Sequence, residues 1–163
     1  MTRHLVIVLG DQLDEQSSAF DGFDPAQDVI WMVEVMEEST HVWSSKQRSV
    51  LFFSAMRHFA QALRARSTAG VPWRVDYTQL DDPRSAGTLA GELARAIEQH
   101  RPAQLVLTAP GDWRVLQALR SVALQASLHL ELRDDTHFFT TVRDFAAHAK
   151  GRKQLRLEYF YRE

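Results

Sequence analysis

Five acidic or amide side chains follow two apolar segments of this chain and could bind a polar organic ligand. They are Asp11, Gln12, Glu34, Glu37 and Glu38. Carboxylates accept strong hydrogen bonds from hydroxyl groups, and an amide can pair with both the donor and the acceptor edge of a heterocyclic ring. The chemistry that these residue types indicate is therefore recognition of a polyhydroxyl or heterocyclic molecule.

The two segments before these side chains are predicted to be central strands. Residues 4–9 and 29–33 are continuous apolar runs rich in Val, Ile and Leu, which is typical of strands buried on both faces of a parallel sheet. Open α/β sheets bind ligands beyond the carboxyl ends of their strands. We therefore expect the five side chains to converge at one edge of a sheet.

Further strands and helices alternate along the rest of the chain. Additional strands are predicted at residues 73–78, 104–108 and 128–132, whereas residues 10–28 are expected to be mostly loop with a short helix. Apolar residues at helical spacing predict helices after a capping box at Ser44 and Gln47 as far as Gly70, along 89–97, along 116–123, and after Thr141 and Asp144. This order predicts a doubly wound, Rossmann-like α/β fold, with a parallel sheet of about five strands and helices on both faces.

A second loop is expected to face the acidic residues. If the first strand is central, the strand order reverses between it and the strand that ends at Thr108. The following turn contains Pro110 and Gly111 and leads into a helix, whose free N–H groups can bind a polar or anionic ligand. Gly111 is therefore also a candidate binding residue.

Several function classes have no support in the sequence. There is no glycine-rich dinucleotide or P-loop motif, no nucleophile elbow and no H-E-x-x-H motif, so we expect no catalytic residue in this chain. The absence of cysteine excludes disulfides and thiolate metal sites. A net charge of -2 gives no global attraction to nucleic acid. No apolar run is long enough for a membrane span, and we expect a single-domain, cytoplasmic protein.

Structural explanations compete with the functional ones. Asp11 and Glu34 could cap a helix or remain solvated, and Arg57 and His58 are predicted to form a surface pair. The Phe-rich face of residues 52–59 is predicted to be core rather than a cofactor site. From the residues alone, a general nucleotide-binding module and an interaction domain without a ligand both remain open.

Several longer strings in the chain carry a family resemblance. VIVLGDQLD, VEVMEESTHVWSSKQR, TAPGDWRVLQAL and GRKQLRLEYFYRE resemble the amino-terminal part of the photolyase-related proteins, the iron-sulfur bacterial cryptochromes and (6-4) photolyases. The resemblance covers essentially the whole chain. It departs from the family pattern at residues 39–45, where changes could alter the size of the pocket.

The resemblance implies an antenna domain of a light-driven enzyme or photoreceptor. Residues 1–149 would be the α/β domain that binds 6,7-dimethyl-8-ribityllumazine, and Asp11, Gln12, Glu34 and Glu37 are carried over by motif position. Residues 150–163 would begin the connection to a helical domain outside this chain, which holds FAD and a [4Fe-4S] cluster. The pigment would pass excitation energy to FAD for DNA repair or blue-light signalling. DNA would be bound only by the intact protein.

The carboxyl end differs in charge from the rest of the chain. From Arg143 to Glu163 there are six Lys or Arg and three Asp or Glu, interleaved with Phe and Tyr. Such a segment is typical of surfaces that contact phosphate. In the intact protein we expect it to pack on the carboxyl-terminal helical domain, whereas in isolation its exposed aromatic residues predict a homodimer.

Overall fold

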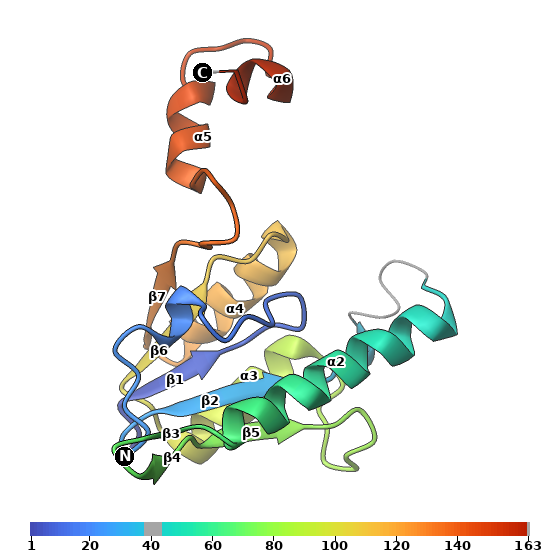
Figure 1. The fold of residues 1–163 in the computed structure, drawn as a ribbon, viewed down its shortest axis with the longest axis vertical. Coiled ribbons are helices and arrows are strands. Elements are labelled where there is room, and N and C mark those ends of the chain that lie inside the picture. Colours follow the sequence, from blue (N-terminus) through green and yellow to red (C-terminus); the bar gives the residue numbers. More distant parts are fainter. Residues whose placement is uncertain (38–43, 163) are drawn as a thin grey trace.

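A five-stranded parallel sheet forms the centre of the protein. The computed structural model describes residues 1–37 and 44–162. The strand order is β5-β2-β1-β6-β7, and all neighbouring pairs are parallel (Figure 1). The strands are β1 (His4–Ile7), β2 (Val29–Val33), β5 (Val75–Thr78), β6 (Gln104–Thr108) and β7 (His129–Arg133). The predicted doubly wound α/β sheet is confirmed.

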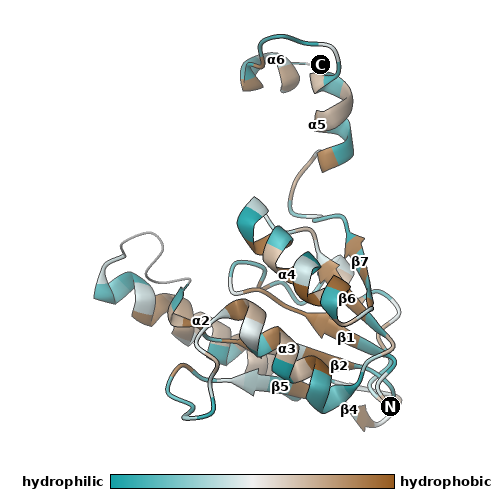
Figure 2. Ribbon diagram, turned by 180° about the vertical axis from the view of Figure 1, so that it is seen from behind, coloured by the Kyte–Doolittle hydropathy of each residue, from teal (hydrophilic) through white to brown (hydrophobic). Residues whose placement is uncertain are grey.

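Helices cover both faces of this sheet. The long helix α2 (Lys46–Arg64) lies on one face, and α3 (Leu89–His100) and α4 (Trp113–Gln125) lie on the other (Figures 1 and 2). The remaining elements are η1 (Ser18–Phe20), β3 (Ser67–Thr68), β4 (Val71–Pro72), α5 (Val142–Ala149) and α6 (Leu157–Phe160). Helices α5 and α6 stand apart from the sheet layers, beyond the end of β7 (Figure 1).

Two hydrophobic clusters hold the layers together. Successive side chains of a strand point to opposite faces of its sheet. In β1, Leu5 and Ile7 therefore pack toward α3 and α4, whereas Val6 packs toward Met56 and Leu63 of α2. Full burial of each large aliphatic side chain contributes roughly 1.5–3 kcal/mol. The continuous apolar run of β1 thus reflects its position between two helical layers.

Two details of the α2 region differ from the sequence prediction. The helix begins after Ser45, whose Oγ accepts a hydrogen bond from the N–H of Arg48, so the predicted capping box at Ser44 is wrong by one residue. The helix ends at Arg64, and a short β3–β4 hairpin that was not predicted turns at Ala69 and Gly70, both with positive φ. By contrast, the last helix opens after Thr141 as predicted, and Thr141 and Asp144 form a capping box there.

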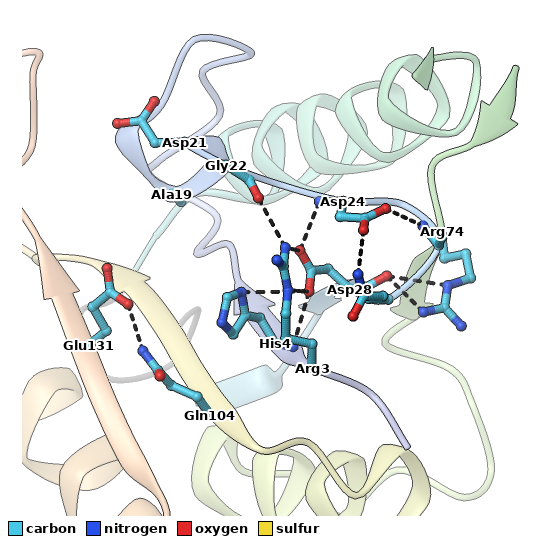
Figure 3. A network of polar contacts seen from close by, with 12 residues as sticks. Arg3, His4, Ala19, Asp21, Gly22, Asp24, Asp28, Arg74, Gln104 and Glu131 are labelled. Carbon is cyan, nitrogen blue, oxygen red and sulfur yellow. Dashed lines mark hydrogen bonds and ion pairs between the residues drawn. The ribbon is translucent and has the colours of Figure 1, made fainter. Parts of the chain in front are cut away.

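A buried carboxylate anchors the amino edge of the sheet. Asp28 is fully buried and accepts hydrogen bonds from Arg3 Nε at 2.8 Å and from the backbone N–H groups of His4 at 3.1 Å and Asp24 at 2.8 Å (Figure 3). Burial alone would raise the pKa of Asp28, but the hydrogen bonds and the positive charge of Arg3 lower it overall. Arg74 donates to the Asp28 carbonyl oxygen, at 3.0 Å from its Nη2. The loop before β2 is thereby tied to both neighbouring strands.

We predict that Asp28→Asn lowers the free energy of unfolding at neutral pH by about 1–3 kcal/mol, because a buried hydrogen-bonding group loses its charge and a matched acceptor. Since the folded-state pKa of Asp28 is depressed, the wild-type advantage is present at neutral pH and disappears as the pH falls through that pKa. Urea denaturation at several pH values measures this effect. Asp21→Asn, at an exposed position, is the control, and equal stability of both variants at neutral pH would contradict the account.

Candidate functional site

A pocket of about 540 Å³ lies at the carboxyl edge of the sheet, where the strand order reverses between β1 and β6. Its polar lining residues are Asp11, Glu37, Ser44, Arg48, Asp112 and Arg114. Its apolar lining residues are Leu9, Phe52, Leu89, Pro110, Val115 and Ala118. These residues come from the ends of β1, β2 and β6 and the starts of α2, α3 and α4. The predicted switch point is confirmed, and it contains a pocket.

The structure brings some of the candidate residues into this pocket. Asp11 and Glu37 line it, and Gly111 lies between two lining residues, with open space where a side chain would be. Gln12 and Glu34 are buried and are not part of the pocket lining. Glu38 and the departures from the family pattern at residues 39–43 lie outside the described residues.

Asp11 is a pocket carboxylate whose surroundings disfavour its charged form. Partial burial of its carboxyl group is the largest cause that raises its pKa; a backbone hydrogen bond lowers the pKa, and the negative charges of Asp135 and Asp112 add smaller increases. The residue as a whole is still exposed to solvent. Asp11 is thus an accessible carboxylate whose charge is poorly compensated by the protein, which favours a hydrogen-bond donor in front of it.

Gln12 connects the loops on the two sides of the switch point. Its Nε2 donates to the carbonyl oxygens of Thr108 at 3.1 Å and Ala109 at 3.2 Å. Because carbonyl oxygens only accept hydrogen bonds, these contacts fix the orientation of the amide. Its Oε1 is buried and has no hydrogen-bond partner among the described residues. Gln12 therefore ties the loop after β1 to the loop after β6 and retains one unused acceptor.

Glu34 is fully engaged with the protein. Its Oε1 accepts from Arg57 Nε at 2.7 Å and from the Tyr77 hydroxyl at 2.5 Å, and its Oε2 accepts from Arg57 Nη2 at 2.8 Å and from the Leu80 N–H at 2.9 Å. A carboxylate has about four lone-pair sites. All of them are used here, so Glu34 supports the wall between α2 and β5.

The pKa shifts in this cluster agree with its geometry. Burial would raise the pKa of Glu34, but hydrogen bonds from Arg57, Tyr77 and the Leu80 N–H lower it overall. Burial and the neighbouring Glu34 carboxylate raise the pKa of Tyr77. The prediction that Arg57 forms a surface pair with His58 is wrong, because its guanidinium binds Glu34 in a bidentate manner.

Glu37 lies between the end of β2 and the start of α3. Its Oε2 accepts a hydrogen bond from the N–H of Leu89 at 3.3 Å. Leu89 is the first residue of α3, where N–H groups lack partners within the helix and the helix dipole favours a negative charge. The contact therefore places the Glu37 carboxylate at the edge of the pocket.

Sequence reasoning missed three residues that shape the pocket: Arg48, Phe52 and Arg114. Phe52 was predicted to be core, yet it lines the pocket, and a Cβ on Gly10 would lie 2.4 Å from its Cζ. Gly10 thus allows the phenyl ring to lie close to the end of β1. Arg48 precedes Phe52 by one helical turn, and residues at i, i+4 spacing lie on the same face of a helix. This spacing was the signal in the sequence that could have placed both side chains together.

Arg114 and Asp112 form a pair at the start of α4. Arg114 Nη2 lies 2.5 Å from Asp112 Oδ2, and the Asp112 side chain caps the helix by accepting from the N–H of Arg114 at 2.8 Å. The hydrogen bonds to Arg114 lower the pKa of Asp112. The positive charge of Arg114 is therefore largely balanced by its neighbour.

Neither a metal centre nor a membrane span is found in the part of the chain that the structure describes. Within residues 1–37 and 44–162, no group of three or more His, Cys, Asp or Glu could hold a metal ion. None of the described helices combines the length and the apolar character needed to cross a membrane.

The fold and the pocket define a doubly wound α/β domain with a pocket at its switch point, and the comparisons assign the chain to a family. Residues 6–163 match the family of deoxyribodipyrimidine photo-lyase-related proteins. The chain is 42% identical over 159 residues to a (6-4) photolyase of Agrobacterium fabrum (strain C58). It therefore belongs to the photolyase-related family, which confirms the resemblance. The alignment covers 98% of this chain and 30% of that relative, so the chain spans less than a third of the relative's length.

We predict that Glu34→Gln lowers the free energy of unfolding by about 1–3 kcal/mol, because the new amide N–H₂ faces donors and half of the acceptor capacity is lost. The partial exposure of Arg57 keeps the loss below that of a fully buried ion pair. Chemical denaturation at neutral pH measures it. Glu98→Gln, at an exposed position of α3, should change stability by less than about 0.5 kcal/mol. A similar small change for Glu34→Gln would contradict the proposed supporting role.

Proposed function

We propose that this domain binds a light-harvesting pigment of the ribityllumazine type, 6,7-dimethyl-8-ribityllumazine, in the pocket between β1 and β6. The observation that carries the proposal is the composition of the pocket, which combines apolar walls with a few accessible carboxylates. Small-molecule sites are typically concave, mostly apolar and supplied with a few polar groups that orient the ligand. Membership of the photolyase-related family gives this composition its functional context.

The residues of the pocket suit the two parts of such a pigment. A flat heterocycle can pack against apolar side chains such as Phe52 and Val115, while the hydroxyls of the ribityl chain donate to Asp11 and Glu37. Gln12 ties the loops after β1 and β6 together and does not contact the ligand in this proposal. Glu34 stabilises the neighbouring wall and does not contact the ligand in this proposal.

The charges of the pocket favour a neutral polyol over a nucleotide. Three acidic residues and two arginines line it, and one of the arginines, Arg114, is paired with Asp112. The remaining balance is negative, which repels a phosphate group. In addition, Asp112 caps the start of α4, where a phosphate would otherwise meet free N–H groups. A general nucleotide-binding function is therefore less well supported.

In the longer protein, the pigment would pass excitation energy to FAD. We propose that FAD and a [4Fe-4S] cluster belong to a helical domain that follows this chain, and that this domain is its partner. The complete protein would carry out light-driven DNA repair, as a carbon–carbon lyase, or blue-light signalling in the cytoplasm. The residues of this chain would bind and orient the pigment and keep water away from it, without taking part in bond chemistry.

We predict saturable binding when 6,7-dimethyl-8-ribityllumazine is titrated into the protein and followed by visible absorption and fluorescence. Asp11→Asn and Glu37→Gln should each raise the dissociation constant about tenfold. Each substitution removes a charge-assisted acceptor that contributes about 1.4 kcal/mol to binding. Asp21→Asn and Glu98→Gln, which change the same charges at exposed positions, should bind normally.

Two outcomes of this titration would contradict the proposal. Stabilisation by ATP or AMP without any response to the pigment would favour the nucleotide-binding alternative, since a ligand that binds the native state raises the melting temperature. No response to any of these compounds would favour an interaction domain without a ligand.

A further inference from the structure

Arg48 carries a positive charge into the switch-point pocket without a partner for it. The other pocket arginine, Arg114, lies 2.5 Å from Asp112 and is balanced by that carboxylate. The Arg48 side chain, by contrast, forms no ion pair and no hydrogen bond with any residue that the structure describes, and it is exposed to solvent. The N–H groups of its guanidinium are therefore available to a ligand in the pocket.

The helix that carries Arg48 does not account for a cation at this position. Arg48 lies in the first turn of α2, where its backbone N–H donates to Ser45 Oγ at 3.3 Å. The positive end of the helix dipole makes this turn unfavourable for a cation. No acidic residue is present in the turn to offset the effect. The guanidinium thus contributes no favourable interaction to α2 itself.

Arg48 and Phe52 approach the pocket from the same face of α2. They are four residues apart, a spacing that places side chains next to each other along a helix, and both line the pocket. Gly10 allows the Phe52 ring to lie close to the end of β1, because a Cβ on Gly10 would be 2.4 Å from the Phe52 Cζ. A flat heterocycle packed against Phe52 would therefore lie next to the Arg48 guanidinium.

We propose that Arg48 is a specificity-determining residue that donates hydrogen bonds to the carbonyl edge of the bound heterocycle. A guanidinium only donates hydrogen bonds, and its planar fork suits a planar group with two acceptors. The pyrimidine half of a lumazine ring carries two carbonyl oxygens and offers such a group. The inference rests on the proposed function and deepens it: Asp11 and Glu37 accept from the hydroxyls, and Arg48 donates to the ring.

This arrangement selects heterocycles by the polarity of their edge. A ring with an amino group in place of one carbonyl would direct N–H donors at the guanidinium, and donors left unpaired in a contact shielded from water are costly. An anionic phosphate drawn to Arg48 would meet the carboxylates of Asp11 and Glu37 in the same pocket. The expected ligand class is therefore a pyrimidine-2,4-dione ring that carries a polyhydroxyl chain.

Titration of 6,7-dimethyl-8-ribityllumazine into the full 163-residue chain tests the role of Arg48. Arg48→Gln should raise the dissociation constant about tenfold or more, because charge-assisted hydrogen bonds to the ring are lost. Arg48→Lys should bind roughly threefold more weakly than wild type, since an ammonium keeps the charge but not the planar fork. Lys46→Gln removes the same charge from the same exposed turn of α2, outside the pocket lining, and should bind normally.

The absorption spectrum of the bound pigment separates a ring contact from a general effect of charge. A hydrogen bond to a conjugated carbonyl changes the energy at which the ring absorbs, whereas a hydrogen bond to a ribityl hydroxyl does not involve the conjugated system. At saturating pigment, Arg48→Gln should therefore shift the absorption maximum, and Asp11→Asn should leave it at the wild-type position. The melting temperature of unliganded Arg48→Gln should equal that of wild type, because no protein contact is lost.

Three results would overturn the inference and leave the pigment site in place. They are unchanged affinity in Arg48→Gln, an equal loss of affinity in Lys46→Gln, and an unshifted absorption maximum in Arg48→Gln at saturation. A lower melting temperature of the unliganded Arg48→Gln chain would also overturn it, since the residue would then support the fold. A wild-type chain that does not bind the pigment at all would instead contradict the proposed function on which the inference rests.

Discussion

The pairing of β1 with β2 on one side and β6 on the other is the constraint on which the rest of the structure depends. Because β1 is central, its side chains must be apolar on both faces, and helices must cover both. The strand order runs from β1 to β2 and β5 on one side and to β6 and β7 on the other. The loops after β1 and β6 therefore separate at the carboxyl edge and leave the pocket between them. Gln12 spans the two loops and ties them together through hydrogen bonds to the carbonyl oxygens of Thr108 and Ala109.

The acidic residues after the strands divide into two groups with different electrostatic surroundings. Glu34 receives hydrogen bonds at both oxygens, and its pKa is lowered. Asp11 lies at the pocket with partial burial and two acidic neighbours, and its pKa is raised. A carboxylate that the protein already satisfies stabilises the fold, whereas one that it leaves uncompensated is available to a ligand. This difference underlies the assignment of a supporting role to Glu34 and a binding role to Asp11.

The sequence was informative about elements and the position of the site, because both follow from local patterns. Continuous apolar runs identified β2 and β6 with their observed bounds, and the polar residues after β1 led to Asp11. The partner of Glu34 could not be predicted, since Arg57 reaches it across 23 positions and an exposed helical arginine has no distinctive spacing. Phe52 was assigned to the core because core residues and pocket residues of a helix recur with the same period. The close approach of Phe52 to Gly10, which places its ring at the end of β1, is visible only in the structure.

A crystal structure of the chain with 6,7-dimethyl-8-ribityllumazine is the most direct test of the central claim, that the switch-point pocket is the pigment site. The account predicts density for the ring against the apolar wall that includes Phe52 and Val115, with ribityl hydroxyls within hydrogen-bond distance of Asp11 or Glu37. Pigment bound elsewhere, for example in the hollow lined by His148 and Lys150, with the switch-point pocket unchanged, would contradict it.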